Sequence, residues 1–183
     1  MSQLPWESKM RRTNAEAEWM APEEVVQQVR LHYFEAVNWL HDSTFEAWAA
    51  QWSEAPAHLS GSFLKRHQQA LMSNRDSSLP GIVGVLRCDH TIEVRHFSAQ
   101  GGDCLIVDHQ TGRRMATYNR ETQQRLNTQD LGDGAVVYRM HYDSRSRRWK
   151  IDHFVQELPV AWGSARRRIR ETSNMPTSFG RDY

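Results

Sequence analysis

The last two strand-like segments of the chain, residues 135–142 and 149–156, can be paired with each other from the sequence alone. A turn centred on Arg145 and Ser146 joins them, and pairing outward from this turn separates their residues onto two faces. The mostly apolar face pairs Tyr142 with Trp149, Met140 with Ile151, Tyr138 with His153 and Val136 with Val155. The mostly charged face pairs Asp143 with Arg148, His141 with Lys150, Arg139 with Asp152 and Val137 with Phe154. A slip of one residue would mix the two sets, so burial of one face favours this register. The pattern predicts a curved hairpin with one side on a hydrophobic core.

The N-terminal part of the chain has helical periodicity. Pro22 is tolerated as a first helical residue. Apolar residues then recur at three- and four-residue spacing, at Val26, Val29, Tyr33, Val37 and Leu40. This spacing predicts a long amphipathic helix. Ser43 and Glu46 have the spacing of a capping box for a second helix, which Pro56 is expected to end, and residues 60–72 predict a third helix.

Beyond Gly81 the apolar residues alternate with a period of two, which is typical of strands. The predicted strands before the final pair are residues 82–88, 91–98, 103–108, 114–119 and 125–131. Glycine-containing turns are expected at 100–103, 110–112 and 132–134. These connections are too short for crossover helices, so the sheet is expected to be a mainly antiparallel meander. Helices followed by strands predict an α+β fold, with the helices covering one face of a bent sheet.

Composition limits the classes of protein to consider. The 183 residues suffice for one domain, expected at 22–159, with an N-terminal arm at 1–21 and a basic C-terminal tail at 160–183. The net charge of +1 gives no strong field toward nucleic acid or an anionic membrane. No apolar run is long enough to cross a bilayer. Cys88 and Cys104 fall in predicted strands without a cysteine-pair motif, which is typical of buried thiols in a reducing cytoplasm.

The order of elements, with two characteristic segments, resembles the nuclear transport factor 2-like superfamily. These segments are the helical VRLHYFEAVNWLHDSTFEAWAAQW, which contains Tyr33-Phe34-Glu35-Ala36, and the terminal GAVVYRMHYDSRSRRWKIDHFV, which contains Trp149-Lys150-Ile151. The resemblance covers residues 22–159 and extends to the polyketide-cyclase and ketosteroid-isomerase relatives. It implies a cone-shaped half-barrel whose sheet wraps the long helix, a pocket at the wide end, and frequent dimerisation through the outer sheet face. It does not imply one activity, because members include dehydratases, isomerases, cyclases, transport adaptors and structural subunits.

Catalysis in this superfamily generally needs a carboxylate or a histidine inside the cone. Strand parity places four candidates toward an apolar face: His153, Tyr138, His96 and Asp108. A Tyr138–His153 pair could polarise a carbonyl group and move a proton, with Asp108 as a base. The alternative is structural: the polar atoms of the pair bond to each other or to the backbone, and Asp108 caps a turn. No metal-ligand spacing occurs among the nine histidines, and no phosphate-binding loop is present, so no metal and no cofactor are expected.

A second set of residues indicates a binding surface. Val137 and Phe154 pair on the outer face, and Phe97 extends the stripe if its strand pairs in phase. Arg139 lies on the polar rim of this apolar patch. Exposed apolar patches usually mark contacts, so the sequence predicts a homodimer or a larger assembly. The tail, which contains Arg166, Arg167 and Arg168, is expected to pack on a neighbouring chain.

These observations leave three functions open. The first is a non-catalytic binding or assembly domain that self-associates through its sheet face and engages a protein partner or a small apolar ligand. The alternative is a cofactor-free lyase or isomerase, of dehydratase or cyclase type, acting on an apolar ring or carbonyl compound inside the cone. The third is nucleic-acid binding through the arginine-rich tail, which neighbouring acidic residues disfavour. A hollow cone would favour the enzyme, and a filled cone would favour assembly.

Overall fold

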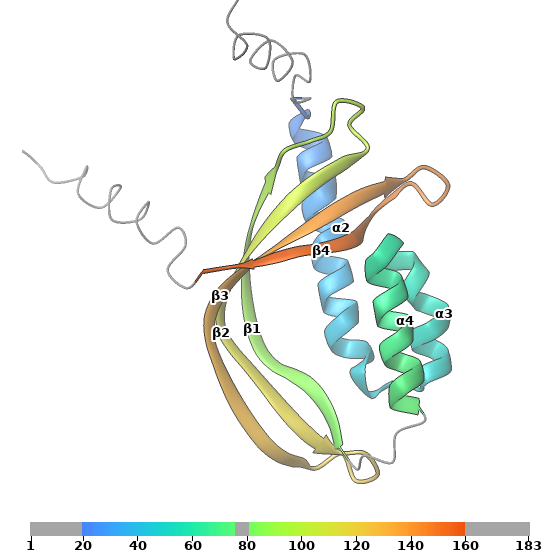
Figure 1. Cartoon of the computed structure of the whole chain (residues 1–183), viewed down its shortest axis with the longest axis vertical. Coiled ribbons are helices and arrows are strands. Elements are labelled where there is room, and N and C mark those ends of the chain that lie inside the picture. The colour runs from blue at the N-terminus through green and yellow to red at the C-terminus, as the bar shows by residue number, and fades with distance from the viewer. Residues whose placement is uncertain (1–19, 76–80, 160–183) are drawn as a thin grey trace, which may run out of the picture.

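The protein is an α+β domain in which three helices precede a four-stranded antiparallel sheet. The computed structural model describes residues 20–75 and 81–159. The elements are α2 (Glu23–Asp42), the short 3₁₀ helix η1 (Ser43–Phe45), α3 (Trp48–His58), α4 (Gly61–Arg75), β1 (Gly81–Arg95), β2 (Asp103–Asn119), β3 (Arg125–Asp143) and β4 (Arg148–Leu158). The strand order β1-β2-β3-β4 confirms the predicted meander. The sheet is curved but not closed, and α2, α3 and α4 lie on its concave side (Figure 1), so the predicted fold class is confirmed.

Helix α2 is long because one stripe of its residues is buried against the sheet. Its buried residues are Val29, Tyr33, Ala36 and Val37, at the spacing of one helical face. The second helix differs from the prediction. Ser43 is buried in η1 and makes no side-chain cap, and Glu46 has an extended backbone (φ −77°, ψ 159°) that delays α3 until Trp48. Pro56 lies inside α3 rather than ending it, two residues before the last helical residue, His58. A proline so close to the end of a helix removes only one late hydrogen bond.

The strands are longer than predicted, because two of the expected turns are bulges within continuous strands. Pairing between β2 and β3 shifts between Gln110 and Arg113, next to Gly112 (φ +59°) on β2 and Gly132 (φ +66°) on β3. Glycine adopts this left-handed conformation at little cost. The predicted turns at 110–112 and 132–134 are therefore wrong, whereas the turn at 100–103 does join β1 to β2.

The register of the final hairpin is confirmed only near its turn. Tyr142 pairs with Trp149 and Met140 pairs with Ile151, as predicted, and His141–Lys150 and Asp143–Arg148 hold as well. A bulge then shifts the pairing, so that Arg139 lies opposite His153 and Tyr138 opposite Phe154. The predicted pairs Tyr138–His153, Val136–Val155, Val137–Phe154 and Arg139–Asp152 are consequently wrong.

The junction between α3 and α4 packs on the edge of β4 at this bulge. Leu59 forms an isolated parallel bridge with Ile151, and the Ser60 amide donates to the Ile151 carbonyl oxygen at 2.9 Å. Gly61 follows with φ +49°, and a Cβ atom there would lie 2.2 Å from Oδ1 of Asp152. The junction thus covers this sheet edge, and glycine is required where α4 begins.

The core fills the concave side of the sheet where the helices cover it. Its largest fully buried apolar side chains are Tyr33, Leu59, Ile106, Met140, Ile151 and Val29. They come from α2, from the α3–α4 junction and from β2, β3 and β4. Strand β4 pairs only with residues 135–143 of β3. The remaining part of the sheet, here called the distal half (residues 81–87, 113–119 and 125–133), extends beyond β4 as three strands (Figure 1).

Candidate functional site

A cluster of polar side chains is buried between α2 and the sheet. Asp108, on β2, is fully buried, and its Oδ2 atom is the shared acceptor of the cluster. The Tyr33 hydroxyl donates to it at 2.9 Å and the Gln110 side-chain amide at 2.8 Å. Nδ1 of His90, on β1, lies 2.8 Å from the same oxygen. One carboxylate thereby connects α2 with two neighbouring strands.

The titratable hydroxyl and thiol groups around this carboxylate are held in their neutral forms. Burial, followed by the charge of Asp108, raises the pKa of Tyr33 well above its usual value. The same two causes, in the same order, raise the pKa of Tyr138 to about 12 and that of Cys88 to about 11. Tyr33 therefore remains a hydrogen-bond donor, and the Cys88 thiol does not become a thiolate at neutral pH.

Two polar atoms in the cluster have no hydrogen-bond partner among the described residues: Asp108 Oδ1 and His90 Nε2. Both atoms are inaccessible to solvent. The ring of His41, at the end of α2, lies 5.7 Å from the ring of His90. Burial and, secondarily, the proximity of His90 lower the pKa of His41. The cluster therefore continues from the fully buried Asp108 toward the half-buried His41.

Sequence reasoning found two members of this environment and missed three. Asp108 points inward, as its phase with Cys104 and Ile106 predicts, and the ring of Tyr138 lies 6.0 Å from that of Tyr33. Tyr33 was expected only as part of the helix stripe, and neither His90 nor Gln110 was expected. His90 is two residues from the buried Ile92 in the continuous strand β1. Residues two apart in a strand point to the same face, so His90 points inward with Ile92. The prediction missed this because it placed a break between two strands at residues 89–90.

The other two predicted catalytic residues do not reach the cluster. His153 is exposed, and its Nδ1 atom contacts the Ser62 hydroxyl of α4. The bulge separates it from Tyr138, so the predicted Tyr–His pair is not formed. His96 is exposed just beyond β1, with φ 50°. Neither histidine lies inside the curved sheet.

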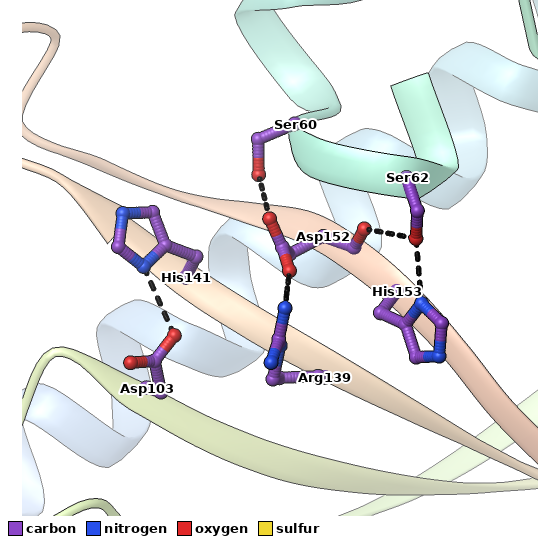
Figure 2. A network of polar contacts seen from close by, with 7 residues as sticks. All are labelled: Ser60, Ser62, Asp103, Arg139, His141, Asp152 and His153. Atoms are coloured by element: carbon purple, nitrogen blue, oxygen red, sulfur yellow. Dashed lines mark hydrogen bonds and ion pairs between the residues drawn. The ribbon is translucent and has the colours of Figure 1, made fainter. Parts of the chain in front are cut away.

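A second polar network joins α4 to the sheet (Figure 2). The Asp152 carboxylate accepts from the Ser60 hydroxyl at 3.1 Å and from Nε of Arg139 at 2.9 Å. The Ser62 hydroxyl donates to the Asp152 carbonyl oxygen at 3.4 Å. Alongside, Nδ1 of His141 lies 2.9 Å from the Asp103 carboxylate. The Ser60 and Ser62 contacts hold the start of α4 on the bulged strand, and the other two join neighbouring strands. Arg139, predicted as part of an interface rim, pairs within its own chain.

The predicted apolar patch on the outer sheet face is not formed. Phe154 packs edge-on against Tyr138, with ring centroids 5.9 Å apart, because the bulge moves it to the helix-covered side. Phe97 is buried against Trp149, with ring centroids 6.0 Å apart, and Val137 is also buried. These three residues therefore do not form one exposed surface. Arg166, Arg167 and Arg168 lie outside the described residues, so nucleic-acid binding through the tail stays a prediction.

An open groove lies on the helical layer. It has a volume of about 480 Å³ and is lined by Trp52, Lys65, Gln68, Gln69, Met72 and Ser73. Trp48 is exposed nearby on α3, where the Arg75 guanidinium lies 5.2 Å from its ring centroid. Across residues 20–75 and 81–159, no group of three or more acidic, histidine or cysteine side chains could hold a metal ion.

Comparison with known proteins yields similarity to solved structures but to no family model. No family model matches the sequence, and no curated protein matches it. Among solved structures, the intermembrane space region of the chloroplast protein ARC6 is similar at 12% sequence identity and a TM-score of 0.48, over 76% of this chain and 98% of that chain. In the part of the chain that the structure describes, no helix is both long and apolar enough to span a membrane.

Proposed function

We propose that this chain is a non-catalytic binding domain of the nuclear transport factor 2-like superfamily, which engages a protein partner and self-associates. The observation that carries the proposal is that Tyr33 and Asp108 meet on the concave side of the sheet with no exposed surface. A substrate pocket instead needs an open concave site in which polar groups converge.

The Asp108 cluster is readily explained as a structural connection. Tyr33 anchors the middle of α2 to β2, and His90 adds a contact from β1. Hydrogen bonds that join buried polar groups of different elements favour one arrangement of those elements. The superfamily assignment rests on the long first helix and the curved antiparallel meander that partly surrounds it. A cytoplasmic location accords with the free thiols of Cys88 and Cys104.

Nuclear magnetic resonance of the full chain, with isoleucine methyl groups labelled, tests whether the interior binds ligands. Aromatic and carbonyl-containing fragments should leave the Ile106 and Ile151 methyl signals unchanged, because both side chains are fully buried in the core. A fragment that shifts these signals, and no longer does so in an Asp108→Asn variant, would overturn the proposal.

Self-association remains part of the proposal, but the surface must differ from the one predicted. Val83 and Leu126, in the distal half, are 56% and 58% exposed. Exposed apolar groups on a sheet are common sites of association. Sedimentation velocity at micromolar concentration should show a dimer for the wild type and a monomer for a Val83→Glu/Leu126→Glu variant. A monomeric wild type would contradict self-association.

A cofactor-free lyase or isomerase is the second candidate, favoured by one observation. Asp108 Oδ1 and His90 Nε2 are buried without partners among the described residues. In that function Asp108 would accept a proton from carbon, while the neutral hydroxyls of Tyr33 and Tyr138 would stabilise negative charge on a carbonyl oxygen. The fragment experiment decides between the two functions.

A further inference from the structure

The groove between α3 and α4 has a marked charge imbalance. Helix α4 carries Lys65, Arg66 and Arg75 and no acidic residue. Lys65 and Arg66 are exposed, and no carboxylate of the described residues pairs with either. The acidic residue of α3, Glu54, accepts a hydrogen bond from Nε1 of Trp39 on α2 at 3.1 Å. Among the described residues, Glu54 makes no ion pair with Lys65, the cation that lines the groove.

The groove follows one face of α4 and combines polar side chains with two large apolar ones, Trp52 and Met72. Lys65 lies three and four residues before Gln68 and Gln69, and Met72 lies three and four residues after Gln69 and Gln68, so these side chains form a single stripe. The stripe is about 10 Å long, at about 1.5 Å per residue. Trp52 of α3 borders it and is 38% exposed. Tryptophan and methionine are enriched in protein–protein contacts, and side-chain amides can hydrogen-bond a peptide backbone.

We propose that this groove binds a short acidic segment of a partner protein. A large apolar side chain of the segment packs on Trp52 and Met72, and a neighbouring carboxylate pairs with Lys65. The inference rests on the proposed binding function and names the chemistry of its partner. Charge complementarity favours this occupant: a second copy docked through the same groove would bring its own Lys65 against this one, and the arginine-rich tail would be repelled as well.

Selection of short random peptides on the immobilised full chain tests this inference. The enriched peptides should combine acidic residues with one or more large apolar residues. Their affinity, measured by fluorescence anisotropy, should fall about tenfold or more with Lys65→Glu and with Trp52→Ala. Arg145→Glu makes the same charge change at the exposed β3–β4 turn, so it is the matched control and should alter affinity by less than about twofold.

Two results would overturn the groove proposal: enrichment of no acidic, apolar class of peptide, or equal binding of that class to wild type and Lys65→Glu. Native thermal unfolding of the Lys65→Glu variant shows that its loss of binding is not a loss of fold. The proposed function fails separately, through fragment binding in the interior. A failed peptide selection alongside unchanged Ile106 and Ile151 signals would therefore remove only the groove assignment.

Discussion

The Asp108 cluster and the α3–α4 groove differ in the exposure and the pairing of their polar side chains. Inside, one carboxylate accepts from Tyr33 and Gln110 and contacts His90, with no exposure to solvent. Outside, the groove combines an exposed tryptophan with a lysine that no described carboxylate pairs. The interior groups are used to hold the chain together, whereas the groove groups contribute little to holding it. In the proposed function, the residues whose types most suggest catalysis therefore serve the structure, because they are buried between α2 and the sheet.

Removal of the buried carboxylate should have the largest effect on stability. Asp108→Ala leaves Tyr33, His90 and Gln110 without their common partner, and it should lower the free energy of unfolding by about 3 kcal/mol or more. Urea unfolding measures this change. Asp130→Ala is the matched control: its carboxylate is exposed, pairs loosely with Arg114 at 3.5 Å and accepts from the Gly132 amide at 2.8 Å, so it should cost about 1 kcal/mol or less. Equal costs for the two variants would mean that the cluster does not stabilise the fold.

The contact between α4 and β4 should be nearly as sensitive. Gly61→Ala introduces a side chain in a left-handed conformation and 2.2 Å from Asp152 Oδ1, so we expect a loss of about 2 kcal/mol. Gly102→Ala is the control, because no atom lies within 4 Å of its Cβ position. Circular dichroism during chemical unfolding would reveal the difference. A neutral Gly61→Ala would show that α4 does not need its close approach to β4.

Mild acid should weaken the helical layer by a smaller amount. The rings of His58 and His67 both lie next to the ring of Trp39. Burial is the main cause that lowers the pKa of each histidine below 6.5. The unfolded chain then binds more protons than the folded chain once the pH falls through 6.5, so stability is constant above that value and decreases below it. The loss of stability between about pH 7.5 and about pH 5.5 should be smaller in a His58→Gln/His67→Gln variant. An unchanged pH dependence would exclude these two histidines as its source.

The sequence alone predicts the pairing of strands close to a turn. It does not predict the register where contacts with residues distant in the chain determine it. The pairs nearest the final turn, such as Met140 with Ile151, follow from alternation and were predicted. The shift beyond them involves Asp152 and its contact with Ser60, 92 residues earlier in the chain, which no local pattern reveals. A similar limit applies to the cluster. Asp108 was predicted to face inward from its own strand, but its partners come from a helix and another strand, and identifying them requires the packing of all three.

The affinity of the groove-binding peptide for two single variants tests the central claim that the outer surface, and not the interior, performs the function. Asp108→Asn should reduce stability yet bind the peptide within about twofold of the wild type, when both are measured where the variant is folded. Lys65→Glu should keep its stability and lose about tenfold or more in affinity. Loss of binding in a folded Asp108→Asn variant, with binding retained in Lys65→Glu, would contradict this account and return the function to the interior cluster.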